Sequence, residues 1–305
     1  MSRHRTDDVP ERGDRSKRHI DGPLGIVAGR GPLPCLLAEA ATARGLPVHI
    51  VGIRGEASDE IERFSHTWMK WGELGKLFGA LDDHGCRDLV IVGGVNRPDL
   101  ANVKFDFTAV KHLPFLLSLG KGGDDNILSR IVDFFEQKGY RVHGPEEVLP
   151  DLLVGVGILG DKAPSGEDRA DIELGFRVVA SLGHLDIGQA AVIAKGHVLA
   201  VEAAEGTDAM LERIVELRQS GRVSLPGRAG VLVKAPKPGQ EQRIDLPTIG
   251  SETVRRAAAA GLAGIAVAAG QVLVAELART IDAANRQGLF LVGEPVPQET
   301  KSSAP

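Results

Sequence analysis

Cysteine and aromatic residues are scarce in this chain of 305 residues. It contains only two cysteines, Cys35 and Cys86, which excludes a disulfide framework and a zinc site built on cysteines alone. Both lie in or beside apolar patterns, where small buried thiols are expected. Aromatic residues make up 4% of the chain and Gly occurs 38 times, so we expect cores of Val, Leu, Ile and Ala.

Long apolar runs and a strong excess of one charge are also missing. No stretch of about 20 apolar residues is available to cross a membrane. Residues 1–21 lack the apolar middle of a secretory signal, so we expect a disordered tail and a cytoplasmic protein. A formal net charge of −5 argues against nucleic-acid binding, which needs a concentrated basic face. Length and composition predict a two-domain protein that acts on small molecules.

The first half of the chain has the pattern of an α/β domain. Residues 24–34 combine a short apolar strand with a Gly-rich turn, a helix follows to Gly45, and 46–53 form the next strand. This is a βαβ unit, whose strands pair in parallel. Further helices and strands, ending with 140–144, predict a doubly wound, Rossmann-like domain over 23–151.

The second half has a different pattern and predicts a mixed α/β domain over 152–294, with short tails at 1–22 and 295–305. Two strands are expected around Gly196, and a similar strand–Gly–strand pattern recurs at 261–276. The two stretches align as a weak internal repeat that places Asp208 on Asp282. If the repeat is real, the domain consists of two similar β-β-α halves.

Two Gly-rich turns at strand ends are candidates for ligand contact. Gly29 and Gly31 lie between a strand and a helix, which suits a phosphate at a helix N-terminus, although Pro34 stands where a dinucleotide site needs a third Gly. Asn96 and Arg97 follow a buried strand, where open α/β sheets bind ligands. The structural alternative is that both segments simply reverse the chain.

Charged residues gather at two further places. Lys121 lies in a Gly-rich, acidic loop that suits an anionic group but is also a common surface feature. The second domain places Glu202, Glu205 and Asp208 around a strand end and a helix start, and carboxylates of this kind bind Mg²⁺. For Asp208 and for Thr207 beside it, helix capping is the alternative.

The segment 234–250, KAPKPGQEQRIDLPTIG, is the richest in chemistry. Two prolines stiffen the chain beside Lys234 and Lys237, and Asp245 sits between Ile244 and Leu246. A charged carboxylate in an apolar setting needs a metal or a cationic partner. An ion pair with a nearby lysine or arginine that only shapes the loop is the alternative.

Five motifs, AGRGPLP (28–34), GVNRP (94–98), DIGQ (186–189), EGTD (205–208) and the segment 234–250, together resemble the LpxI family of UDP-2,3-diacylglucosamine pyrophosphatases. The resemblance runs in order from about Leu24 to Gly293. It implies a Rossmann-like first domain and a distinct second domain, with the substrate in the cleft between them. It also implies Mg²⁺-dependent hydrolysis of UDP-2,3-diacylglucosamine to UMP and 2,3-diacylglucosamine 1-phosphate in lipid A biosynthesis.

The resemblance also implies roles for individual residues. Asp245, Lys234 and Lys237 are expected to act in catalysis, and Asp245, Glu205 and Asp208 are the expected Mg²⁺ ligands. The expected substrate contacts are Gly29, Gly31, Asn96, Arg97, Lys121, Gln189, Thr207, Gln240 and Thr248.

A lipid-linked substrate implies peripheral contact with the cytoplasmic face of the inner membrane, and a homodimer is possible. The basic residues before Leu24 are a candidate for contact with anionic lipid, with a plain solvated tail as the alternative. Two other classes stay open at this point: a nicotinamide-dependent oxidoreductase, which lacks its full fingerprint here, and a non-catalytic UDP-sugar-binding or regulatory module.

Overall fold

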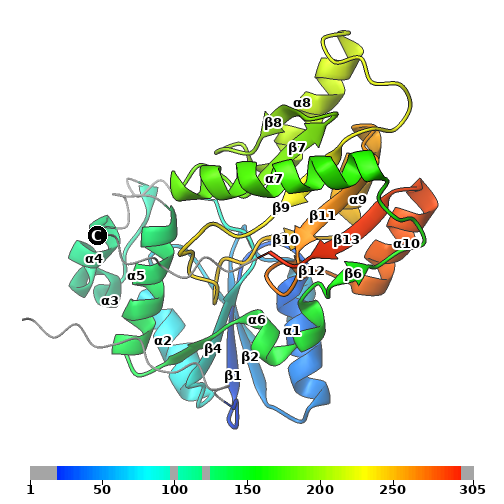
Figure 1. Cartoon of the computed structure of the whole chain (residues 1–305). Coiled ribbons are helices and arrows are strands. Elements are labelled where there is room, and N and C mark those ends of the chain that lie inside the picture. Colours follow the sequence, from blue (N-terminus) through cyan, green and yellow to red (C-terminus); the bar gives the residue numbers. More distant parts are fainter. Residues whose placement is uncertain (1–18, 97–101, 119–123, 297–305) are drawn as a thin grey trace, which may run out of the picture.

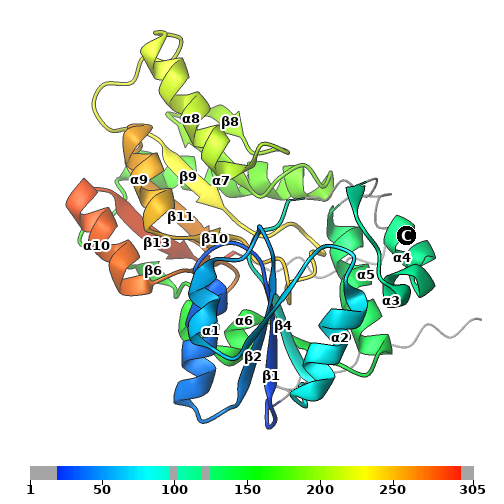
Figure 2. The same ribbon diagram turned by 180° about the vertical axis from the view of Figure 1, so that it is seen from behind.

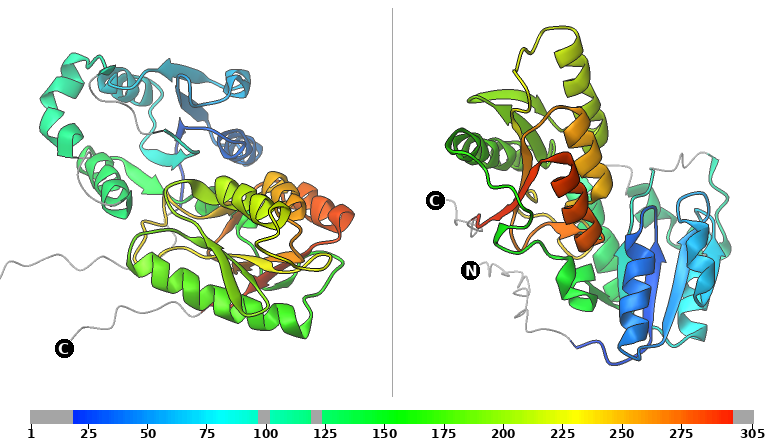
Figure 3. Two further views of the ribbon diagram at one scale, coloured as in Figure 1. Left: turned by 90° about the horizontal axis from the view of Figure 1, so that it is seen from above. Right: turned by 90° about the vertical axis from the view of Figure 1, so that its right-hand side faces the viewer.

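The computed structural model describes residues 19–96, 102–118 and 124–296. They form two large β-sheets, each with its own covering helices, that lie next to one another, and a small two-stranded sheet (Figures 1 and 3). This arrangement confirms the predicted α/β class, with a parallel sheet in the first half of the chain and a mixed sheet in the second.

The first sheet contains five parallel strands: β1 (Leu24–Ala28), β2 (Val48–Ile53), β3 (His66–Met69), β4 (Asp88–Val92) and β5 (Arg141–His143). Their order in the sheet is β3-β2-β1-β4-β5, an order found in doubly wound sheets. The strands are nearly continuous apolar runs because both faces of the sheet are covered. Sequence patterns did not predict β3, which is short and half-buried.

Successive side chains of β1 point to opposite faces of the sheet and contribute to two separate apolar cores. Ile26 joins a core with α1 (Leu33–Ala43) and α6 (Pro145–Val148) on one face, and Val27 joins a core with α2 (Leu74–Asp83) and α5 (Asp124–Gln137) on the other. Helices and short helical turns of this half are α1 (Leu33–Ala43), η1 (Asp59–Arg63), α2 (Leu74–Asp83), α3 (Phe107–Lys111), α4 (Leu113–Ser118), α5 (Asp124–Gln137), α6 (Pro145–Val148) and η3 (Pro150–Leu152).

A buried charge network ties β4 to β5. Asp88 is 1% exposed and accepts two hydrogen bonds from the Arg141 guanidinium, at 2.7 and 2.6 Å. Buried His143 contacts the same carboxylate at 2.8 Å and Glu147 at 3.1 Å. Burial favours the neutral form of Asp88, but its hydrogen bonds with Arg141 and His143 outweigh burial and lower its pKa below 3.8.

We expect Asp88→Asn to lower the free energy of unfolding by about 3 kcal/mol, because it leaves the buried His143 and the half-exposed Arg141 without their buried counter-charge. Since the carboxyl pKa is lower in the folded chain, this stabilisation is complete above pH 3.8 and is lost as the pH falls through the folded-state value. Urea denaturation at neutral pH measures the loss. Asp82→Asn, at an exposed ion pair with Arg87, is the matched control and should cost under about 1 kcal/mol. Equal effects of the two variants would contradict the prediction.

The second sheet contains six strands in the order β6-β13-β11-β9-β7-β8. The three central strands are parallel, and β7, β8 and β6 run antiparallel to their neighbours. The strands are β6 (Gly157–Ile158), β7 (Ala190–Ala194), β8 (His197–Val201), β9 (Val231–Lys234), β11 (Gly264–Ala268) and β13 (Phe290–Glu294). A separate two-stranded sheet pairs β10 (Thr248–Ile249) with β12 (Leu273–Val274).

One face of the larger sheet is covered by α7 and the other by α8, α9 and α10 (Figures 1 and 2). Gly175 of α7 lies directly against β9, since a Cβ there would meet Val233 at 2.4 Å. These helices are α7 (Gly166–His184), α8 (Gly206–Gln219), α9 (Ser251–Ala259) and α10 (Leu277–Gln287).

The internal repeat predicted in this half is wrong. β7 and β8 form a hairpin around Gly196, but β12 leaves the large sheet and pairs with β10. The residue before β12, Val272, accepts a backbone hydrogen bond from Val154 in the connection between the halves. In addition, Asp208 lies in the first turn of α8, whereas Asp282 lies in the middle of α10.

The loop between β9 and β10 joins the two halves of the molecule. Leu246 packs against the first-half core that contains α1, together with Leu273 of β12. Ile244 packs against the core on the opposite face of the first sheet. The chain segment that carries Asp245 is therefore held by both apolar cores of the first half.

Candidate active site

Buried polar side chains concentrate at one place in the second half. Among the described residues ten polar or charged residues are buried, and five of them lie around the carboxyl end of β9: Glu202, Lys234, Lys237, Gln240 and Glu241. Buried polar groups are costly unless they are paired, so such a concentration is typical of a functional site.

Lys234 is the last residue of β9 and is 5% exposed. Its ammonium group donates to the Thr207 hydroxyl at 2.9 Å and to the Thr248 carbonyl oxygen at 3.4 Å. Thr207 in turn donates to the Glu202 carboxylate at 2.8 Å. The Thr207 hydroxyl thus links a buried cation to a buried anion, and helix capping is not its role, since no side chain caps α8.

Burial lowers the pKa of Lys234 below its ordinary 10.5. The negative charges of Glu202, Asp208 and Asp245 act in the opposite direction but do not offset the loss of hydration. Three predicted site residues, Lys234, Asp208 and Asp245, are therefore close enough to interact electrostatically.

Gln240 organises the loop that carries Asp245. Its side-chain oxygen accepts from the Lys237 backbone N–H at 2.8 Å, and its amide nitrogen donates to the Asp245 carboxylate. The same nitrogen lies 3.4 Å from the side-chain oxygen of Gln189. The structure thus brings together four of the predicted site residues, Gln189, Lys237, Gln240 and Asp245.

Lys237 forms an ion pair with Asp186 at 2.5 Å, a partner that sequence patterns missed. Asp186 has a φ of +54°, in the left-handed region that few residues other than Gly adopt. It follows the end of α7, where Gly183 packs so closely on Lys237 and Pro238 that a Cβ would meet Pro238 at 2.6 Å. The one available signal was the DIGQ motif, which begins at this residue.

Arg243 connects this loop to the first half of the chain. Its guanidinium contacts Glu241 in the loop at 2.8 Å and Glu136 of α5, also at 2.8 Å. Sequence reasoning assigned no role to Glu136 or Glu241. Since 107 residues separate Arg243 from Glu136, only the folded chain reveals the pairing.

In the first half, the predicted Gly turn lies against the end of β4. A Cβ at Gly29 would meet the Gly93 carbonyl oxygen at 2.6 Å, so close backbone packing explains this glycine. Gly31 has a φ of +97° and open space around it. Asn96 accepts a hydrogen bond from Arg30 at 3.0 Å, which ties the two turns together. The predicted contacts Arg97 and Lys121 lie outside the described residues.

The predicted Mg²⁺ ligands are not gathered into one cluster. Within the described ranges, no group of three or more His, Cys, Asp and Glu side chains is placed to hold a metal ion. Glu205 pairs with Arg213 at 3.1 Å, and the exposed Asp208 pairs with Arg256 at 3.4 Å. Asp245 is the predicted ligand that accepts a hydrogen bond from Gln240 in the β9–β10 loop, and the Mg²⁺ site stays a prediction.

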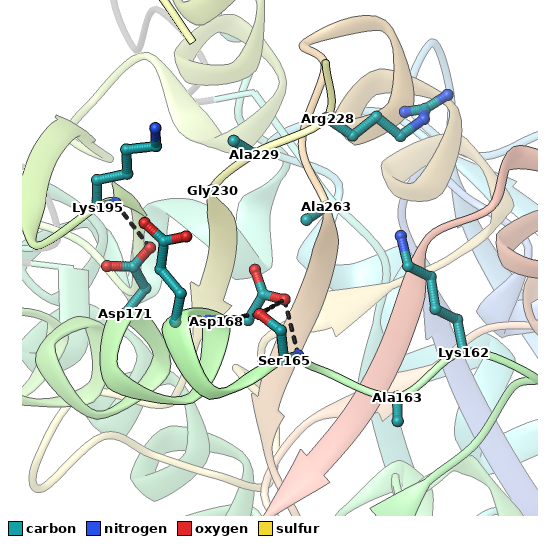
Figure 4. Close-up of a pocket in the computed structure, with 11 residues that line it drawn as sticks. Lys162, Ala163, Ser165, Asp168, Asp171, Lys195, Arg228, Ala229, Gly230 and Ala263 are labelled. Carbon is teal, nitrogen blue, oxygen red and sulfur yellow. Dashed lines mark hydrogen bonds between the residues drawn. The ribbon is translucent and has the colours of Figure 1, made fainter. Parts of the chain in front are cut away.

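A pocket of about 310 Å³ lies at the opposite end of β9 (Figure 4). Lys162, Lys195 and Arg228 border it together with Asp171, whose carboxylate accepts from the backbone N–H of Lys195 at 2.8 Å. Because β9 starts next to this pocket and ends at Lys234, the pocket is separate from the buried cluster.

The fold and the site define a two-domain α/β protein whose lysine- and carboxylate-rich site is suited to an anionic ligand. Models of the LpxI N-terminal and C-terminal domains match residues 23–152 and 155–292. The chain is also 44% identical over 270 residues to a protein of Caulobacter vibrioides named UDP-2,3-diacylglucosamine pyrophosphatase LpxI, covering 88% of this chain and 96% of that protein. The chain belongs to the LpxI family.

Proposed function

We propose that this protein hydrolyses the pyrophosphate bond of UDP-2,3-diacylglucosamine to UMP and 2,3-diacylglucosamine 1-phosphate, a step of lipid A biosynthesis. The observation that carries the proposal is the buried Lys234, paired through Thr207 and close to Asp245, in a chain that matches the LpxI family over both domains. The printed name of the Caulobacter vibrioides relative supports the same reaction.

Lys234 and Lys237 supply the positive charge that pyrophosphate cleavage needs. Negative charge on the phosphoryl oxygens must be neutralised as the bond breaks, and fixed cations in a poorly hydrated site do this effectively. The Lys237 ammonium forms an ion pair with the Asp186 carboxylate. A substrate phosphate would take over this contact from Asp186.

Asp245 is the proposed catalytic carboxylate, as the base that takes a proton from the attacking water or as a Mg²⁺ ligand. Mg²⁺ is commonly bound by one or two carboxylates together with substrate phosphates, rather than by a closed cage of protein ligands. Asp245 and Asp208 would supply these two carboxylates. Glu205 completes the proposed ligand set, although Arg213 occupies it here. When bound, the ion supplies charge neutralisation and a more acidic water.

The remaining predicted residues are proposed as substrate contacts. Thr207 and Thr248 contact Lys234, and Gln240 contacts Gln189 and the Lys237 backbone. All four residues offer polar groups to the phosphates or the sugar. The turns of the first domain, with Gly29, Gly31 and Asn96, are the proposed contacts on the other side, together with Arg97 and Lys121.

Because the substrate is lipid-linked, the proposal includes contact with the cytoplasmic face of the inner membrane. It also includes association of the chain as a homodimer. Among the helices in the described ranges, none has the length and apolar character that crossing a bilayer takes.

The test is release of UMP from UDP-2,3-diacylglucosamine by the full chain, with Mg²⁺ and with a chelator. Turnover that stops with chelator and returns with added Mg²⁺ would support both the reaction and its metal requirement. Turnover that persists in chelator would remove Mg²⁺ from the proposal and keep the hydrolase. Binding of the substrate without UMP release would favour a UDP-sugar-binding module instead.

We expect Arg243→Gln to lower kcat about fivefold, because it loosens the loop that carries Asp245 by about 1 kcal/mol of partly exposed ion pairing. Glu136→Gln should have a similar effect, and the double variant should be no worse than either single change. Initial rates of UMP release measure this. Arg255→Gln, at an exposed ion pair on α9, is the matched control and should leave kcat unchanged. Additive losses in the double variant would show that the two residues act separately.

A further inference from the structure

The segment 102–116 of the first domain is apolar and yet poorly buried. Eight of its fifteen residues are Val, Phe, Leu or Ala, but within this segment only Ala109 is buried. The segment contains α3 and the start of α4, which project beside α5 at one side of the molecule (Figure 1). Exposure of so much apolar surface is typical of an interaction site.

Phe107 and Val110 form the most exposed part of this segment. Phe107 is 75% exposed, the highest value among the large apolar side chains of the described residues, and Val110 is 52% exposed. They lie three residues apart on α3 and so on the same side of the helix. Phe115, by contrast, stacks on Phe134 of α5 at 4.3 Å and holds the segment to the domain.

The charges of the segment are sorted by sign. Asp106 is its one acidic residue, and its carboxylate points inward, accepting from the backbone N–H groups of Gly75 at 2.6 Å and Ala109 at 2.7 Å. Lys104 and Lys111 are exposed, and the Lys111 ammonium lies 4.5 Å from the centre of the Phe107 ring. Besides the Phe107 ring, the segment thus exposes two lysines, of which Lys111 lies beside the ring, while its one carboxylate is held by backbone N–H groups of the domain.

We propose that the α3 surface, formed by Lys104, Phe107, Val110 and Lys111, docks on a bilayer that contains anionic phospholipid. Aromatic and aliphatic side chains enter the interface between headgroups and acyl chains, and lysines beside them are attracted to the negative surface. This inference rests on the proposed function insofar as a lipid-linked substrate gives the protein a reason to reach a membrane.

The position of the α3 surface agrees with delivery of a lipid-linked substrate. The segment follows β4, whose carboxyl end leads to the proposed contact Asn96. It packs on α5, which carries the Glu136 that binds Arg243 of the Asp245 loop. Docking through α3 would therefore bring α5 close to the bilayer, and α5 is connected to the proposed active site through Glu136 and Arg243.

The test is sedimentation of the full chain with vesicles of phosphatidylcholine that contain phosphatidylglycerol, compared with phosphatidylcholine alone. We expect binding to the anionic vesicles that weakens as salt is added. Phe107→Ser and the double variant Lys104→Glu/Lys111→Glu should each weaken vesicle binding by about tenfold or more. Turnover of substrate dispersed in detergent should not change, because these side chains are exposed and lie outside the proposed site.

Two matched controls keep the test specific. Val198→Ser replaces an exposed valine of β8, and Arg222→Glu/Arg286→Glu reverses two exposed charges of the second domain. Both should bind vesicles like the unaltered chain. Equal losses in the α3 variants and the controls, or vesicle binding that the α3 variants leave intact, would overturn the proposal.

Two further outcomes are distinguishable. Loss of self-association in Phe107→Ser with unchanged vesicle binding would assign the surface to a second copy of the chain and overturn the membrane proposal. If the chain releases no UMP from any form of the substrate, the proposed function fails, but the sedimentation result still decides whether α3 binds lipid.

Discussion

Asp245→Asn is expected to reduce turnover of UDP-2,3-diacylglucosamine by roughly a thousandfold while leaving the fold intact. The amide has nearly the shape of the carboxylate but cannot take a proton from water and is a weak ligand for Mg²⁺. Its oxygen can still accept from Gln240, the hydrogen bond that fixes the loop in the native chain. The apolar anchors on either side, Ile244 and Leu246, are unaffected by the change.

Steady-state UMP release, with kcat and KM determined separately, measures this effect. A loss confined to kcat would place Asp245 in the chemical step, whereas a rise in KM alone would make it a binding residue. Asp282→Asn on the exposed side of α10 is the matched control for the same chemical change. Turnover within tenfold of the unaltered chain would remove Asp245 from the catalytic role.

The part of the site near Asp245 could be predicted because its residues are close together in the sequence. Lys234 ends the buried strand β9, and Lys237, Gln240 and Asp245 follow on its loop, so one short stretch of sequence brings these four candidate residues near one another. The α/β class was predictable for a similar reason, since each strand and helix carries its own local apolar pattern.

Pairings across the chain were not predictable. Asp186 and Lys237 are 51 residues apart, and their contact depends on α7 ending next to the loop. The internal repeat is the converse case, in which a local sequence pattern predicted a strand pairing that the structure does not contain. Residues 198–202 and 272–276 share a sequence pattern, but β12 pairs with β10, and Val272 before it contacts Val154, a pairing that no local pattern encodes.

Lys234→Met is expected to lower kcat/KM by about 100-fold to 1,000-fold, the second-largest effect we predict. The variant keeps the volume of the side chain and removes the charge that Thr207 and the nearby carboxylates surround. It also leaves Glu202 buried without its cation, so thermal unfolding should be measured in parallel to separate lost activity from lost fold. Lys162→Met, in the pocket at the other end of β9, is the control.

The pH dependence of kcat/KM distinguishes the charge of Lys234 from its mere presence. Because burial lowers its pKa below 10.5, the ammonium is lost at a lower pH than in an ordinary lysine, and kcat/KM should fall on the alkaline side through that lowered value. Between the lowered pKa and 10.5 the unfolded chain holds this proton more firmly, so the contribution of Lys234 to the free energy of unfolding rises with pH.

Lys234→Arg then provides the decisive comparison. A guanidinium does not lose its proton in this range, so whatever activity the variant retains should lack the alkaline decline caused by Lys234. If the decline persists unchanged in Lys234→Arg, it belongs to another group, and the requirement for a charged Lys234 fails. If it disappears, the ammonium at the end of β9 is the charge that the substrate meets, and the buried pairing through Thr207 to Glu202 is what holds it in place.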